Sequence, residues 1–179
     1  IALLDALGRS PWAPLLRKAP SHPDVTHANT LVLLDGRGAA HHPALAAGNV
    51  LITLRNLDAL VVLDPEREEI VWAATGQWAE QHEASVLDDG TLLLFDNTSH
   101  WPRSRVLRFD PVTDAITWSW DGADWPLSSR TCGAVHGLPS GNVLVVASDS
   151  GRAAEVTPDG EVVWDFASPH RAGDGGVLI

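Results

Sequence analysis

The side chains with the widest chemical range in this sequence are its eight histidines. An imidazole titrates near neutral pH, so it can act as a base, an acid or a nucleophile, and several together can bind an anion or a metal. Alignment of similar segments puts His27 and His82 at the same place, the entry of a predicted inner strand. Gly133 holds that place in a third segment, and His136 follows it. His27, His82 and His136 are therefore candidate catalytic residues.

A second group of polar residues follows two other apolar runs. Asn97 ends one of them and precedes His100, Arg103 and Arg105, while Arg55 leaves the equivalent run of the first segment. If these side chains surround one channel, their cations and imidazoles would attract an anion even in a chain of formal charge −11, and a sulfate or phosphate ester is the natural guest. The alternative interpretation is that Asn97 only makes a turn.

Other site chemistries lack the residue spacing that they need. His41 and His42 are adjacent, so on a strand they point to opposite faces, and the sequence has no His-Glu-x-x-His motif and no paired cysteines. A Gly-x-Ser-x-Gly nucleophile elbow is also missing. The single cysteine, Cys132, excludes an internal disulfide. We expect no metal and no cofactor.

The elements that would position these residues form a repeat. Trp72, Trp118 and Trp164 are 46 residues apart, and each follows a Pro-marked turn and an apolar run that starts at a glycine. A period in the forties made of short β-rich runs is typical of propeller blades with four strands each. We expect the three tryptophans to pack between neighbouring blades.

The repeat predicts an all-β fold, a β-propeller of four-stranded blades with a repeat of about 46 residues. Residues 27–170 hold three blades, at 27–74, 82–121 and 133–168, and an insertion at 35–47 interrupts the first. Residues 1–26 are an N-terminal extension or an incomplete blade with short helices at 1–7 and 14–18, and residues 171–179 are a tail leading to missing sequence. Because propellers close with four to eight blades, we expect a section of a larger propeller. Its unpaired edges would invite the missing chain or a second copy, so a homodimer is one expected arrangement.

The charge and hydropathy patterns exclude two classes of partner. With 12 basic and 23 acidic side chains, the chain has no basic stripe to neutralise a nucleic-acid backbone. Its apolar runs fall well short of the roughly 18 residues of a membrane-spanning helix. Position 1 is not Met, so we expect sequence before Ile1, and a signal peptide cannot be read from these residues.

Several short stretches, taken in order, resemble the arylsulfotransferase family of bacterial β-propellers. They span roughly residues 24–170 and are Thr-His-Ala-Asn-Thr at 26–30, Leu-Ile-Thr-Leu-Arg-Asn at 51–56, Gln-His at 81–82, Leu-Leu-Phe-Asp-Asn at 93–97, Ser-Arg at 104–105, Leu-Pro-Ser-Gly-Asn at 138–142 and Glu-Val-Thr-Pro-Asp-Gly at 155–160. The resemblance implies a six-bladed propeller, often periplasmic or secreted. It also implies an enzyme that moves a sulfuryl group from a phenolic sulfate ester to a phenol without the nucleotide donor PAPS.

The resemblance further implies that a channel histidine is transiently sulfated while other histidines and an arginine stabilise the transferred group. His27 and His82 match two channel histidines of the family. The family's nucleophile aligns with residues 147–152, which contain no histidine, so His82 or His136 would take that role. The expected catalytic residues are listed as His82, His27, His136 and Arg105, and the expected substrate-binding residues as Arg55, Asn97, His100 and Arg103. The alternative is a non-catalytic, quinoprotein-like propeller that binds a small anion or a protein.

Overall fold

The computed structural model describes residues 2–21, 23–122 and 124–170. Within these residues, twelve strands form three four-stranded antiparallel sheets, here called blades 1, 2 and 3. Blade 1 contains β1 (Ala28–Leu33), β2 (Val50–Leu54), β3 (Ala59–Asp64) and β4 (Glu69–Thr75). Blade 2 contains β5 (His82–Val86), β6 (Leu92–His100), β7 (Arg103–Asp110) and β8 (Ala115–Trp120). Blade 3 contains β9 (Ala134–Gly137), β10 (Val143–Ala147), β11 (Arg152–Val156) and β12 (Val162–Ala167).

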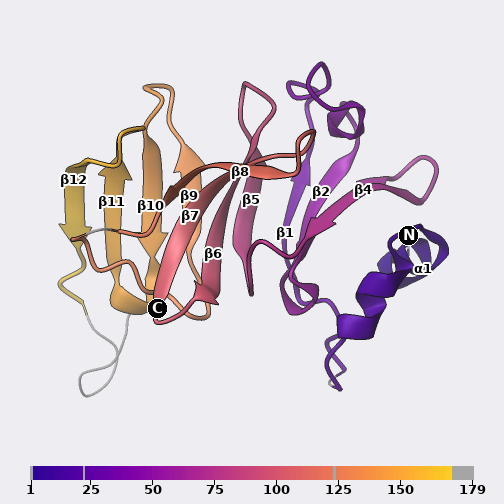
Figure 1. Ribbon diagram of the computed structural model, residues 1–179, viewed down its shortest axis with the longest axis horizontal. Coiled ribbons are helices and arrows are strands. Elements are labelled where there is room, and N and C mark those ends of the chain that lie inside the picture. Colours follow the sequence, from indigo (N-terminus) through magenta and orange to yellow (C-terminus); the bar gives the residue numbers. More distant parts are fainter. Residues whose placement is uncertain (1, 22, 123, 171–179) are drawn as a thin grey trace.

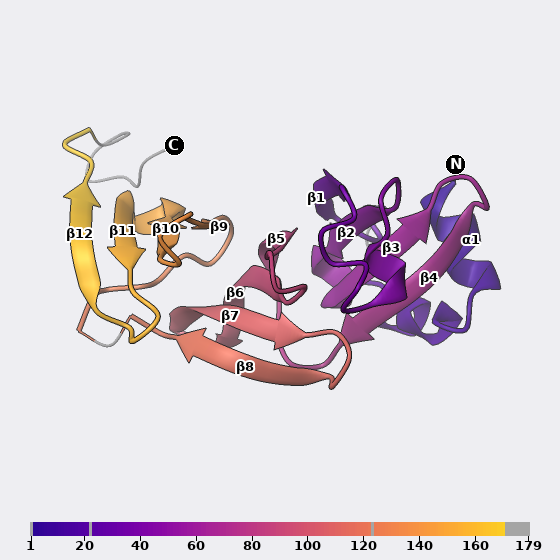
Figure 2. The same ribbon diagram turned by 90° about the horizontal axis from the view of Figure 1, so that it is seen from above.

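The three blades stand side by side, and each runs in chain order from an inner to an outer strand (Figure 1). The inner strands β1, β5 and β9 are neighbours, while β4, β8 and β12 spread outward (Figure 2). This arrangement confirms the all-β propeller architecture. The run that the sequence ends at Asn97 continues as a strand: β6 and β7 extend to His100 and Arg103, which pair with each other in a long hairpin. The polar sequence of that hairpin, interrupted by an irregular register after Asp96, gave no period-two signal.

Successive side chains on a strand point to opposite faces of the sheet, so they pack against different neighbouring blades. On β6, Leu92 and Leu94 pack in a core shared with blade 1, while Leu93 and Phe95 pack in a core shared with blade 3. All four are fully buried. Two apolar layers therefore hold the three blades together.

The N-terminal segment packs on the face of blade 1 that is turned away from blade 2. It contains the helix α1 (Leu3–Arg9) and the 3-10 helix η1 (Ala13–Lys18). Leu7 and Leu15 lie in one apolar core with alternate residues of β2 and β3, such as Ile52 and Val61. Three shorter 3-10 turns occur at η2 (Pro43–Leu45), η3 (Arg55–Leu57) and η4 (Ser148–Ser150). No helix among the described residues is both long and apolar enough to cross a membrane.

The repeated tryptophans lie on the outer strands, and their burial follows the neighbouring blade. Trp72 is 9% exposed and packs 6.4 Å from the ring of Phe109 in blade 2. The indole of Trp118 donates to Pro158 O of blade 3 at 2.8 Å. Trp164 is 48% exposed beside Phe166. The expected packing between blades thus holds for Trp72 and Trp118. It does not occur for Trp164, because among the described residues no further blade covers the outer face of blade 3.

Candidate functional site

The candidate site lies where the inner strands of blades 1 and 2 begin. His82 is the first residue of β5 and lies opposite Phe95, and His27 directly precedes β1, with its carbonyl accepting from Arg55 N–H. Counted back from the equivalent strand ends Leu33 and Val86, His82 stands two residues deeper in its strand than His27 does. The two histidines are thus at the same end of neighbouring strands but not at the same register position, because each strand carries an irregular register at a different place.

His82 is held through one ring nitrogen. Its Nδ1 lies 2.9 Å from Asn97 Oδ1 and 3.0 Å from the Glu80 carbonyl oxygen. Asn97 is fully buried, and its Nδ2 donates to Ser129 O at 2.7 Å and to Cys132 O at 2.8 Å. The last two oxygens belong to the segment that leads into blade 3. The half-buried ring of His82 is therefore held by Asn97, which is itself held by the segment between blades 2 and 3.

Burial lowers the pKa of His82, because desolvation disfavours the imidazolium form. The hydrogen bonds to Asn97 and Glu80 O act in the opposite direction, while the nearby charges of Arg55 and His27 lower the pKa further. The net direction is downward, so His82 is neutral at neutral pH.

His27 is paired with a carboxylate three residues earlier. Its Nδ1 lies 2.5 Å from Asp24 Oδ2, and its backbone N–H donates to Asp24 Oδ1 at 2.8 Å. The carboxylate thereby orients the ring and favours a proton on Nδ1. His27 is about half exposed, so it faces solvent at the mouth of the site.

Arg55 brings a cation to the same place. Its Nη2 lies 3.1 Å from Glu80 Oε1, and its Nη1 donates to Asn56 Oδ1 at 2.9 Å. These contacts use only part of the hydrogen-bonding capacity of the guanidinium, which has a planar fork of N–H donors suited to oxyanions. Arg55 is also mostly buried, with 20% of its side chain exposed, so its charge acts on the site with reduced screening.

The backbone is unusual at this end of the inner strands. His27, Glu80 and Glu83 have positive φ values of 44°, 53° and 49°. Residues other than glycine adopt this region rarely, and each such residue costs on the order of 1 kcal/mol. Clustered costs of this kind are typical of functional sites, where they aim side chains in directions that a regular strand does not allow.

Arg105 has a different environment from the one expected for a channel residue. Its Nε donates to Asp96 Oδ2 at 2.7 Å, and its Nη2 donates to Gln77 O at 2.7 Å. The Asp96 side chain is fully buried and also accepts from the Ala79 N–H at 3.1 Å. The ion pair therefore anchors residues 77–79 to blade 2, directly before the segment that carries Glu80 and His82.

The remaining expected residues are not brought to His82. His100 and Arg103 are exposed at the tip of the β6–β7 hairpin.

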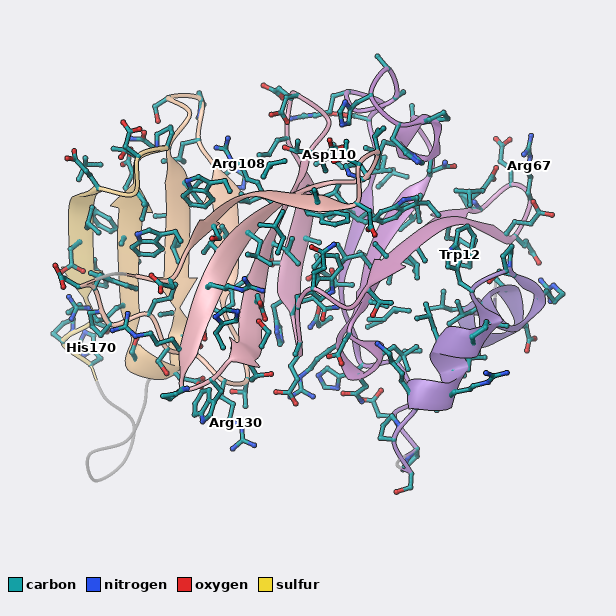
Figure 3. The ribbon with its side chains drawn as sticks, viewed as in Figure 1. Trp12, Arg67, Arg108, Asp110, Arg130 and His170 are labelled. Atoms are coloured by element: carbon teal, nitrogen blue, oxygen red, sulfur yellow. The ribbon has the colours of Figure 1, made fainter. Side chains whose placement is uncertain are left out.

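His136 lies at the far end of β9, where Gly137 is equivalent to Val86 of β5. There it lines a hollow of about 740 Å3 together with Arg108 and residues of all three blades. Figure 3 shows Arg108 and Arg130 at opposite edges of the molecule. Arg108 marks the end that holds His136, and Arg130 marks the end that holds the candidate site, because it is next to Ser129, which contacts Asn97.

Sequence reasoning missed several residues that shape the site. Asp24 was detectable as a carboxylate three residues before His27, and Glu80 as one two residues before His82. The carbonyl groups of Ser129 and Cys132 carry no side-chain signal, and they are 32 and 35 residues away from Asn97. In the described part of the chain, no group of three or more His, Cys, Asp or Glu side chains could hold a metal ion.

The fold and the site together define a β-propeller with an imidazole and guanidinium cluster at one end of its inner strands. The sequence model of the family described as arylsulfotransferase (ASST) matches residues 7–169. The chain therefore belongs to the arylsulfotransferase family. No curated protein matches it significantly.

Solved structures that resemble the chain are β-propellers. Virginiamycin B lyase from Staphylococcus aureus has a TM-score of 0.55 at 13% identity, over 84% of this chain and 44% of the lyase chain. The Dos1 propeller has a TM-score of 0.57 at 10% identity, over 84% and 39% of the two chains. The WD40 propeller domain of Doa1 has a TM-score of 0.55 at 12% identity, over 79% and 41%. At these identities the likeness shows the fold alone, and this chain spans about two-fifths of the length of those proteins.

Proposed function

We propose that the protein is a sulfotransferase that moves a sulfuryl group from a phenolic sulfate ester to a phenol, with His82 as the nucleophile. The observation that carries the proposal is the state of His82. Its Nδ1 faces two hydrogen-bond acceptors, so its proton resides there and Nε2 keeps a lone pair. The lowered pKa keeps this ring neutral and therefore nucleophilic at neutral pH.

In the first half-reaction, Nε2 of His82 attacks the sulfur atom of the ester. An S–N bond forms as the bond between sulfur and the aryl oxygen breaks, and the phenolate leaves with the electron pair. The guanidinium of Arg55 balances the negative charge on the sulfuryl oxygens, as cations do in related group transfers. His27 supplies the proton for the leaving phenolate, because its Nδ1 is held by Asp24 and its Nε2 is the remaining site of proton exchange.

In the second half-reaction, the oxygen of the phenol that receives the group attacks sulfur, and the S–N bond breaks with its electron pair returning to Nε2. The proton of that phenol passes to His27, which restores both histidines. A single base serves in both directions because the two halves are chemically the same step reversed. Ping-pong kinetics are the expected signature of this sequence.

The alternative function is a non-catalytic propeller that binds a small anion. Arg55, His27 and the amide groups near them would serve such a role without any change. What favours catalysis is the arrangement of His82, since a site that only holds an anion gains nothing from a neutral imidazole with a free lone pair.

The test is a burst experiment with p-nitrophenyl sulfate in the absence of an added phenol. We expect one equivalent of p-nitrophenolate per enzyme in a rapid phase, followed by turnover when a phenol is added. His82→Ala should abolish the rapid phase and reduce turnover by about 10³-fold or more. His136→Ala is the matched control, because His136 lies at the far end of its inner strand, and it should leave both phases unchanged.

Two results would contradict the proposal. A wild-type protein that binds the ester but releases no p-nitrophenolate would support the anion-binding alternative. A rapid phase that persists in His82→Ala and disappears in His136→Ala would move the nucleophile to the other end of the blades.

A further inference from the structure

Asn97 occupies a position in which its amide can have only one orientation. Its nitrogen lies between the carbonyl oxygens of Ser129 and Cys132, at 2.7 and 2.8 Å. Carbonyl oxygens only accept hydrogen bonds, so the Asn97 atom facing them must be the NH2 group. The other atom, Oδ1, then faces His82 and can only accept from it, over 2.9 Å.

We infer that Asn97 is a positioning residue that keeps the proton of His82 on Nδ1 and thereby presents the unprotonated Nε2 to the substrate. The inference rests on the proposed function for its consequence, but the tautomer itself is a property of the free protein. Asn97 acts through His82 and needs no contact with the substrate.

The orientation of the Asn97 amide is set by a buried polar network between blades 2 and 3. Asn97, Ser104 and Ser129 are fully buried. The Ser104 hydroxyl lies 2.9 Å from Asn97 O and accepts from the Ser129 N–H at 2.9 Å. Ser129 Oγ in turn accepts from the Asp149 N–H at 3.0 Å, in the turn η4 that follows β10. Because buried groups lose free energy when left unpaired, this network resists a flip of the amide.

The carbonyl oxygen of Glu80 reinforces the same proton position. It lies 3.0 Å from Nδ1 and belongs to a residue with φ of 53°, which is itself held by a hydrogen bond from its N–H to Asp58 Oδ1 at 2.9 Å. Two acceptors on one nitrogen leave no structural reason for the proton to sit on Nε2. Both acceptors therefore favour the same tautomer of His82.

The direct test is nuclear magnetic resonance of the protein with 15N-labelled histidine and no substrate. The wild type should show the ring of His82, assigned by comparison with His82→Gln, as a neutral imidazole with a protonated Nδ1 and an unprotonated Nε2. A wild-type ring protonated on Nε2 would overturn the inference without any variant. This readout does not depend on sulfuryl transfer, so it can succeed when the burst experiment fails, and the reverse.

Two variants separate positioning from folding. Asn97→Ala removes the acceptor, so the Nε2-protonated form of His82 should become detectable and turnover should fall by about 10- to 10²-fold, as for other partners that orient a functional histidine. Asn97→Asp keeps an acceptor oxygen toward His82 while placing its other oxygen against two carbonyls. It should therefore retain the Nδ1-protonated ring although it is less stable than wild type.

Asn142→Ala is the matched control, because the Asn142 amide donates to Glu155 in blade 3 at 2.7 Å, and it should change neither the ring signals nor turnover. If Asn97→Ala does not fold, the wild-type spectrum and Asn97→Asp still decide the question. A His82 ring that keeps the same tautomer and the same turnover in Asn97→Ala would overturn the inference.

Discussion

The buried ion pair between Asp96 and Arg105 makes a quantitative prediction about stability. The Asp96 side chain has no exposed surface and that of Arg105 is 14% exposed. Replacement of Arg105 by Met keeps the volume of the side chain but leaves the carboxylate buried without its cation. Breaking a buried pair in this way costs about 3–5 kcal/mol. For a chain of this size, that loss corresponds to a melting temperature lower by about 6–20 °C.

The measurement is urea unfolding followed by tryptophan fluorescence, for which the chain has eight reporters. The matched control is Arg67→Met, because Arg67 is 72% exposed and lies 3.6 Å from Asp64, in a pair whose loss should cost less than about 1 kcal/mol. The reasoning would be refuted by an Arg105→Met free energy of unfolding no lower than that of Arg67→Met. A double variant with Asp96→Asn should recover part of the loss, since it removes the uncompensated charge.

Three further predictions concern the site and the blade contacts. Arg55→Gln should raise the pKa of His82, because the Arg55 charge lowers it, so the acid limb of p-nitrophenolate release should move to higher pH; an unmoved limb would show that the charge does not act on the nucleophile. Trp72→Ala should cost about 3–5 kcal/mol in urea unfolding and Trp164→Ala about 1 kcal/mol or less, and equal losses would contradict the difference in burial. Gly133→Ala should lower the free energy of unfolding by more than about 1 kcal/mol, because φ there is +146° and a Cβ atom would lie 2.7 Å from the ring of Phe95; a neutral effect would mean that this close contact relaxes freely.

The fold was predictable from the sequence because its signals are local and repeated. The run at 92–95 is apolar at every position since both faces of β6 are covered, and the glycine before it marks the turn. The 46-residue spacing of the tryptophans predicted the positions of the outer strands. It could not show that Trp164 is exposed, because burial depends on the neighbouring sheet and not on the residue.

The candidate site was only partly predictable. His27 and His82 stand out because they occupy the entry of the inner strand in two similar segments, and both lie at the site. The sequence predicts Arg105 at the same site. In the structure Arg105 lies directly opposite Asp96 on the neighbouring strand, and that pairing directs its charge into the blade. The role of Asn97 depends on backbone oxygens of the segment between blades 2 and 3, which no pattern of side chains reveals.

The exposed outer face of blade 3 also has a dynamic consequence. In repeat architectures each unit is stabilised by its neighbours, so a unit covered on one side opens more readily than one covered on both. Blade 2 is covered by blades 1 and 3, whereas Val163 and Trp164 of blade 3 are 55% and 48% exposed. Amide hydrogens of β11 and β12 should therefore exchange with solvent before those of β6 and β7 in this chain.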